Sequence, residues 1–325
     1  MTYETGLPAS PALPYFDAET IAAATPWPAL IAAVREAFGR PHVAPDRHIH
    51  TIEVPGEVSA TALLMPAWIE GEVYGAKLAN IFPSNNRRRQ PAVNSVYVLF
   101  SARTGAPLAI MDGTELTGRR TAAASALMAS YLARPDSRNL LIVGTGRLAP
   151  LLFEAHCAVR DISSAIIWGR NADTATALAA RLSARSAMPV RAEANLETAL
   201  EAADIVSTAT ISTSPLVRGR WVRPGTHLDL VGAFRPDMCE VDAEAVHRSE
   251  VYVDTLSGAK TEAGDLIQAH DQALFAWQDV KGDMAQLCSG SLRIERKSDS
   301  VTLFKSVGAA IEDLAAAELV YRSNG

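Results

Sequence analysis

The chain has 325 residues, of which 48% are hydrophobic and 20% are charged. This composition predicts about two globular domains and excludes a disordered tail or a small disulfide-stapled module. Thirty basic against 36 acidic side chains give a formal net charge of -6, the wrong sign for a general nucleic-acid binder. Three cysteines stand far apart, at Cys157, Cys239 and Cys288, so neither a disulfide framework nor a structural zinc site is indicated.

The start of the chain has no basic region of the kind that opens a secretion signal, and the longest apolar stretch, 122–133, is interrupted by serines. That stretch is shorter than the roughly 18 residues that cross a bilayer. We therefore expect no membrane association, and the cysteine usage favours a cytoplasmic protein.

The first third of the chain mixes helical and strand patterns. Helical periodicity predicts helices over 18–24 and 27–38. Strand-like runs follow at 61–69, 73–82, 95–100 and 107–111, and they are separated by turn residues. Consecutive strands of this kind predict an antiparallel or mixed sheet. A helix rich in Ala and Ser, over 117–133, is expected to connect two domains.

From residue 140 the pattern changes to alternating strands and helices, which predicts a doubly wound parallel sheet and an α/β fold. A final helix is expected over 303–321. Strands are expected over 140–143, 164–168, 190–192, 205–210, 227–231 and 251–253, and helices over 148–159, 172–183 and 196–202.

A glycine-rich motif follows the first of these strands. Gly144 permits a tight turn, Gly146 allows the backbone to approach a pyrophosphate, and Ala149 allows close packing of helix against strand. This context predicts dinucleotide binding, while a Rossmann-like domain for another ligand is the alternative. The expected cofactor contacts of the motif are Gly144, Thr145, Gly146, Arg147, Leu148 and Ala149.

The second strand ends at Gly169, Arg170 and Asn171, where proteins that bind NAD usually place an acid for the ribose 2′-hydroxyl. An arginine there favours a 2′-phosphate, so NADPH is the preferred cofactor, NADH stays possible, and a merely solvated arginine is the alternative. Small residues at Thr208, Ala209 and Thr210 close a later strand. They suit contact with the nicotinamide and its ribose, or mark a plain strand end.

Several blocks of the sequence resemble the ornithine cyclodeaminase/mu-crystallin family, in order and over nearly the whole chain. The resemblance implies a Rossmann domain over 121–302, inserted into an α+β substrate and dimerisation domain of residues 1–120 plus 303–325, and a homodimer. The blocks are Gly75-Ala-Lys77-Leu-Ala-Asn80-Ile-Phe-Pro83, Glu115-Leu-Thr-Gly-Arg-Arg120-Thr-Ala-Ala-Ala-Ser125, Val231-Gly-Ala-Phe-Arg235-Pro-Asp and Thr302-Leu-Phe-Lys-Ser-Val-Gly308.

The family holds a substrate carboxylate with a lysine and two arginines, which match Lys77, Arg120 and Arg47 here. Two guanidinium groups suit a planar carboxylate, and a lysine of adjustable pKa adds charge or donates a proton. For each residue the alternative is an ordinary surface ion pair.

Two departures from the family pattern concern the substrate. The cyclodeaminases have an Asp where this chain has Phe234, and a Glu that matches Leu63. Both acids suit a diamino acid such as ornithine, so their absence favours an uncharged ring in a pocket that includes Met65 and Phe234. The sequence therefore predicts NAD(P)H-dependent reduction of a small cyclic imine 2-carboxylate. Ornithine cyclodeamination and non-catalytic NADPH binding are the alternatives.

Other candidate residues have simpler interpretations. His42, His48 and His50 lack further metal-ligand spacing, so no metal is expected. The arginines 87–89 indicate a solvated loop and no nucleic-acid partner. Asp313 is expected to be an exposed or capping acid, although the family pattern contains it, and the three cysteines are expected to pack in the interior.

Overall fold

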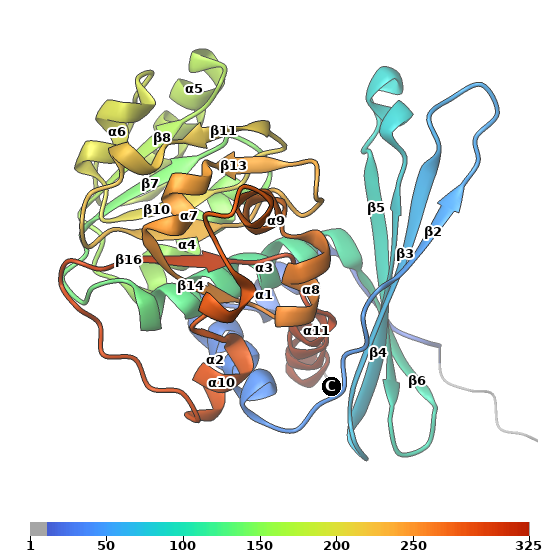
Figure 1. The fold of residues 1–325 in the computed structure, drawn as a ribbon. Helices are drawn as coiled ribbons and strands as arrows, with labels where there is room; N and C mark the ends of the chain where they lie inside the picture. The colour runs from blue at the N-terminus through green and yellow to red at the C-terminus, as the bar shows by residue number, and fades with distance from the viewer. Residues whose placement is uncertain (1–11, 325) are drawn as a thin grey trace, which may run out of the picture.

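Two β-sheets organise residues 12–324, the part of the chain that the computed structural model describes. The six-stranded sheet stands beside the body that holds the second sheet, with α11 between them (Figure 1). Its order is β1-β6-β5-β4-β3-β2, antiparallel except where β1 joins β6, so the predicted mixed sheet is confirmed. Its strands are β1 (Tyr15–Phe16), β2 (His48–Ile52), β3 (Ala60–Ile69), β4 (Val73–Ile81), β5 (Val93–Ser101) and β6 (Pro107–Asp112); η1 (Pro83–Arg88) joins β4 to β5.

Alternation along these strands separates a buried face from an outer face. The register places Met65, Lys77, Tyr97 and Met111 in one row across β3 to β6, and all four are buried. The neighbouring row on the opposite face contains Leu64, Leu78 and Val96, all exposed. The sheet thus has one face on the core and an apolar outer face that no other element of residues 12–324 covers.

The second sheet has eight strands, all parallel, in the order β15-β14-β16-β12-β10-β7-β8-β9. This confirms the doubly wound sheet that the alternation predicted. Its strands are β7 (Asn139–Val143), β8 (Ser164–Trp168), β9 (Val190–Ala192), β10 (Ile205–Thr208), β12 (His227–Leu230), β14 (Ser249–Val253), β15 (Gly282–Asp283) and β16 (Val301–Lys305).

Short elements connect these strands. The pair β11 (Thr213–Val217) and β13 (Cys239–Val241) forms a small separate sheet. The helices are α4 (Leu148–Val159), α5 (Ala172–Arg185), α6 (Leu196–Ala202), α7 (Ala243–His247), α8 (Leu256–Glu262), α9 (Gly264–Asp271) and α10 (Met284–Ser289), with η2 (Gly219–Trp221) and η3 (Trp277–Asp279).

Four helices pack between and beside the sheets: α1 (Ala18–Ala24), α2 (Trp27–Gly39), α3 (Gly113–Leu132) and α11 (Ala310–Asn324). Helix α3 begins at an Asp112 cap and contacts both β5 and β16. Its alanines at 122–124 are fully buried, because small side chains let neighbouring helices approach closely. The helix expected over 117–133 is therefore present and connects the two sheets.

The helix expected over 303–321 is wrong at its beginning. Residues 301–305 form β16, a fully buried strand between β12 and β14, and α11 starts at Ala310. A central parallel strand is covered on both faces and so has a continuous apolar run, which periodicity does not separate from a helix. The boundary expected between 302 and 303 runs through β16, and the one between 120 and 121 falls inside α3. The division into two domains stays a prediction.

No helix among residues 12–324 is long and apolar enough to cross a membrane.

Candidate active site

The glycine-rich turn lies between β7 and α4, at the carboxyl edge of the parallel sheet. Gly144 has a φ of +128°, and a Cβ there would lie 2.7 Å from the carbonyl oxygen of Ala209, so only glycine fits. A Cβ at Gly146 would meet no atom within 4 Å, so there is open space beside the N-terminus of α4. Ala149 is buried and allows close helix packing. These residues fit a dinucleotide pyrophosphate, which binds backbone amides at such a helix end.

The remaining residues of the turn have contacts of their own. Thr145 Oγ1 lies 3.3 Å from the hydroxyl oxygen of Thr174, and Leu148 packs on the core. Arg147 Nη2 donates to Glu115 Oε2 at 2.7 Å. The last contact ties the turn to α3 and thereby to the six-stranded sheet.

The end of β8 presents an unpaired cation. Arg170 is exposed, and it has no ion pair within residues 12–324. Asn171 caps α5 by accepting the amides of Asp173 and Thr174 at 2.9 and 3.1 Å. A free guanidinium next to the N-terminus of a 14-residue helix is a favourable place for an anion.

A buried carboxylate holds the segment that follows β10. Thr208 Oγ1 donates to Glu240 Oε2 at 2.7 Å, and the Thr210 amide donates to Glu240 Oε1 at 2.6 Å. Because Thr208 is fully buried, its hydroxyl is committed to Glu240. The half-buried Ala209 and Thr210 are the residues of this segment that can face a cofactor.

Lys77 and Arg120 meet at one buried carboxylate. Lys77 Nζ on β4 donates to Asp313 Oδ2 at 2.7 Å, and Arg120 Nε on α3 donates to Asp313 Oδ1 at 3.0 Å. Arg120 Nη1 donates to Glu312 Oε2 at 2.6 Å. Among residues 12–324, Arg120 Nη2 has no hydrogen-bond partner, and Lys77 uses one of its three donors. The two predicted residues therefore come together with donors left for an anion.

The charges of this cluster are interdependent. Burial, and after it the charge of Arg120, lower the pKa of Lys77 to about 8, although Asp313 opposes the shift. Burial alone would raise the pKa of Asp313, but the charges of Arg120 and Lys77 outweigh it and lower that pKa. Burial raises the pKa of Glu312 to about 7. Lys77 is thus an ammonium at neutral pH that can release its proton easily.

Arg47 reaches the same place from the segment before β2. Its Nη2 donates to the carbonyl oxygens of Val307 and Gly308 at 3.0 and 2.6 Å, and its Nε lies 3.0 Å from Glu262 Oε1. A Cβ on Gly308 would lie 2.6 Å from Arg120 Nη1. The segment 306–308 therefore lies between the two guanidinium groups.

The predicted pocket residues differ in exposure. Met65 is buried and directly opposite Lys77 in the β3–β4 register. Phe234 follows β12 and is 39% exposed, next to Ala233 with a φ of 51°. Leu63, on β3, is half-buried. The acids that contact Lys77 and Arg120 are Asp313 and Glu312, both on α11. Positions 63 and 234, where the cyclodeaminases have acids, carry none in this chain.

The expectation that Asp313 is exposed or a cap is wrong, since the residue is fully buried between Lys77 and Arg120. Sequence reasoning also missed Glu312 and Glu240. The only signal for Asp313 was its place in the family pattern, because its partners lie 236 and 193 residues away along the chain.

The other residues singled out in the sequence are histidines, surface arginines and the cysteines. The rings of His48 and His50 lie 6.5 Å apart, and residues 12–324 contain no group of three or more His, Cys, Asp or Glu arranged for a metal. Arg88 pairs with Glu57 on the surface. All three cysteines are free thiols, and burial raises the pKa of each, to about 12 for Cys157.

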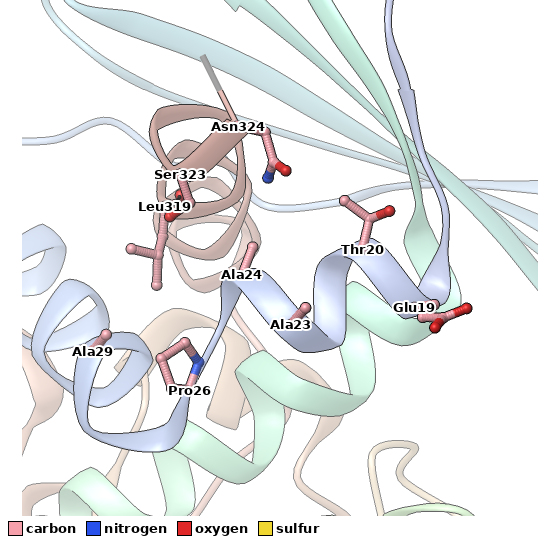
Figure 2. A pocket seen from close by; sticks show the side chains of 9 residues that line it. All are labelled: Glu19, Thr20, Ala23, Ala24, Pro26, Ala29, Leu319, Ser323 and Asn324. Atoms are coloured by element: carbon pink, nitrogen blue, oxygen red, sulfur yellow. Dashed lines mark hydrogen bonds between the residues drawn. The ribbon is translucent and has the colours of Figure 1, made fainter.

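A separate pocket of about 620 Å³ lies between α1, the start of α2 and the end of α11. Figure 2 shows small side chains such as Ala23, Ala24 and Ala29 around it. None of the predicted site residues lines it, and Glu19 is its one charged side chain.

The chain is similar to proteins of known activity over nearly its full length. It is 37% identical to a Delta(1)-pyrroline-2-carboxylate reductase of Colwellia psychrerythraea over 294 residues, 90% of this chain and 93% of that protein. The structure of the Thermococcus litoralis enzyme of the same name, in complex with NADH and L-proline, superposes with a TM-score of 0.90 at 32% identity and covers 96% of this chain and 97% of that one. An archaeal alanine dehydrogenase dimer with bound NAD has a TM-score of 0.88 at 28% identity and covers 96% and 95%.

The model of the ornithine cyclodeaminase/mu-crystallin family matches residues 18–324. That range includes the glycine-rich turn and the cluster of Lys77, Arg120 and Asp313. The resemblance inferred from the sequence blocks is therefore confirmed: the chain belongs to the ornithine cyclodeaminase/mu-crystallin family.

Proposed function

We propose that this protein reduces the C=N bond of a small cyclic imine 2-carboxylate, of the pyrroline or piperideine type, to the cyclic amino acid. The observation that supports this most is the buried cluster of Lys77, Arg120 and Asp313, in which the two cations keep donors that can bind a substrate carboxylate. The names of the relatives agree with this reaction.

Gly144, Gly146 and Ala149 would hold a nicotinamide cofactor at the glycine-rich turn, and this cofactor would supply the hydride for ring carbon 2. Arg120 and Arg47 bind the substrate carboxylate through the guanidinium N–H groups that their protein partners leave free, and so fix the ring. Lys77 donates its proton to the ring nitrogen, so that the C=N bond gains one hydride and one proton and becomes a secondary amine. Asp313 holds Lys77 and Arg120 in place.

The test compares substrates with variants. Purified protein with NADPH or NADH is given Δ1-pyrroline-2-carboxylate or Δ1-piperideine-2-carboxylate, and cofactor absorbance is followed. We expect oxidation in the wild type and none in Lys77→Ala or Arg120→Ala, with cofactor affinity retained in both. Ammonia release from ornithine with NAD would support cyclodeamination instead, and cofactor binding without turnover of any substrate would support a binding protein.

We further propose that NADPH is preferred over NADH. The support is the unpaired, exposed Arg170 beside the capped N-terminus of α5. Arg170→Asp is expected to lower the affinity for NADPH about 10- to 100-fold, because a charge-assisted pair with the 2′-phosphate is replaced by repulsion. The affinity for NADH should change little. Arg181→Asp, on the same helix, is the matched control. Equal losses for both cofactors would refute the preference.

A homodimer through the outer face of the six-stranded sheet is also proposed. The support is the exposed apolar row of Leu64, Leu78 and Val96, because such a face on an isolated chain indicates an interface. The reducing interior of the cytoplasm is the proposed location, since all three cysteines are unpaired.

A further inference from the structure

The segment 306–308 connects the two halves of the protein at the proposed substrate site. It joins β16, in the parallel sheet, to α11, which packs on the six-stranded sheet. Two of its carbonyl groups accept hydrogen bonds from Arg47, and Gly308 lies against Arg120. The position of this segment therefore sets the distance and direction of both guanidinium groups.

A single buried carboxylate fixes the segment. Asp254 Oδ2 accepts the amides of Val307 and Gly308 at 2.7 and 2.6 Å, and the hydroxyl of Ser306 at 3.3 Å. Its Oδ1 accepts the Thr255 amide at 2.7 Å.

Asp254 itself is rigidly placed. It directly follows β14, and its own amide donates to the carbonyl oxygen of Lys305 on β16 at 3.2 Å. It is 1% exposed and has no ion pair among residues 12–324. Burial raises the pKa of Asp254, and the backbone amides that it accepts oppose that shift. Burying a carboxylate costs free energy, and this carboxylate mainly holds one short segment. The geometry of this segment is therefore important for the site.

The shape of the segment depends on these bonds. Gly308 has a φ of +87°, a conformation that orients its amide toward Asp254 while its carbonyl oxygen accepts from Arg47. Without the carboxylate, the two adjacent amides would be buried donors lacking an acceptor, and the segment would rearrange to satisfy them. Such a shift displaces Arg47 directly.

We propose that Asp254 is a positioning residue for the substrate carboxylate, acting through the segment 306–308 on Arg47 and Arg120. The inference rests on the proposed function, since it assumes that these two arginines bind a carboxylate. Asp254 touches neither substrate nor cofactor and is not a catalytic residue.

The main variant is Asp254→Asn, which keeps the shape but turns one acceptor into a donor. We expect the KM for the cyclic imine to rise about 10- to 100-fold, because displacements of the order of 1 Å in positioning groups have effects of that size. The KM for the cofactor should change less than about twofold, because the hydrogen bonds of Asp254 go to Thr255 and to residues 305–308 and not to the glycine-rich turn, among the described residues. A purely structural defect would lower the active fraction and leave both KM values unchanged.

A matched control and a coupling measurement sharpen the test. Asp229→Asn removes another fully buried aspartate of the parallel sheet, hydrogen-bonded to His156 and Ser207, and is expected to leave the imine KM unchanged. If Asp254 acts through Arg47, the imine KM of the double variant Arg47→Lys/Asp254→Asn should be little higher than that of Arg47→Lys alone. Full additivity would overturn the proposal.

A second variant and a binding measurement test the role of Asp254 without relying on the folding of Asp254→Asn or on turnover. If Asp254→Asn does not fold, Ser306→Ala removes only the weakest of the three bonds and should raise the imine KM about two- to fivefold. Binding of pyrrole-2-carboxylate, a planar ring carboxylate that cannot accept hydride, is measured by calorimetry on the cofactor-loaded protein.

These readouts separate the two proposals. Wild-type protein that binds pyrrole-2-carboxylate but reduces no imine would contradict the proposed function alone. Unchanged pyrrole-2-carboxylate affinity and imine KM in folded Asp254→Asn and Ser306→Ala proteins would overturn the role of Asp254.

Discussion

Replacing Asp313 with Asn removes the carboxylate that bridges Lys77 and Arg120. Its oxygens lie 2.7 Å from Lys77 Nζ and 3.0 Å from Arg120 Nε, and all three side chains are buried. Loss of an opposite charge at this range lowers the pKa of a lysine by about 1–3 units. The pKa of Lys77, about 8 in the intact protein, should therefore fall to between about 5 and 7 in Asp313→Asn.

The consequence for activity has a definite sign. At pH 7 roughly nine-tenths of wild-type Lys77 is protonated, against one half or less in the variant. Since the protonated form binds the carboxylate and donates the proton, kcat/KM at pH 7 should fall at least about twofold and up to 100-fold. The loss should diminish as the pH is lowered. Removing one partner of a buried ion pair should also cost about 3–5 kcal/mol of unfolding free energy.

The assay is the pH profile of kcat/KM, followed by cofactor absorbance between pH 5 and 10. We expect the alkaline limb near pH 8 in the wild type and at least one unit lower in Asp313→Asn. Glu318→Gln is the control, because Glu318 lies on the same helix and pairs with Arg322 instead. An alkaline limb that stays at the same pH in folded Asp313→Asn would refute the electrostatic account of Lys77.

Three other perturbations test separate parts of the account. Gly144→Ala places a Cβ 2.7 Å from the carbonyl oxygen of Ala209 at a φ of +128°. Cofactor affinity, measured by fluorescence titration, should therefore fall at least tenfold, and the variant should lose about 1–3 kcal/mol of unfolding free energy. Wild-type affinity in this variant would contradict cofactor binding at the glycine-rich turn. Leu78→Glu buries a charge in the proposed interface and should give monomers in sedimentation, whereas an intact dimer would exclude this face. Phe234→Asp places a carboxylate beside an anionic substrate and should lower kcat/KM for the imine about tenfold, whereas an unchanged kcat/KM would place Phe234 outside the pocket.

Local patterns predicted much of the fold. Helices such as α4 and strands such as β8 were predicted to the residue, because apolar periodicity and turn residues act over short distances. β16 was missed because Val301–Lys305 is buried on both faces and so shows no alternation. The register between strands, which places Met65 opposite Lys77, is set by the fold and is not visible in either strand alone.

The site was predicted in part. Lys77 and Arg120 were identified from family motifs, but their shared partner Asp313 lies on the last helix. Nothing local distinguishes an acid that is buried by distant cations from one at a helix surface. Thr208 shows the same limit, since its hydroxyl bonds Glu240, 32 residues further on.

The most direct test of the central claim follows NADPH and NADH absorbance with Δ1-pyrroline-2-carboxylate and Δ1-piperideine-2-carboxylate, for the wild type and for Arg120→Ala. The account predicts cofactor oxidation in the wild type, formation of the cyclic amino acid in equal amount, and loss of both in Arg120→Ala. Absence of oxidation with either imine, while the protein binds cofactor and releases ammonia from ornithine, would contradict it.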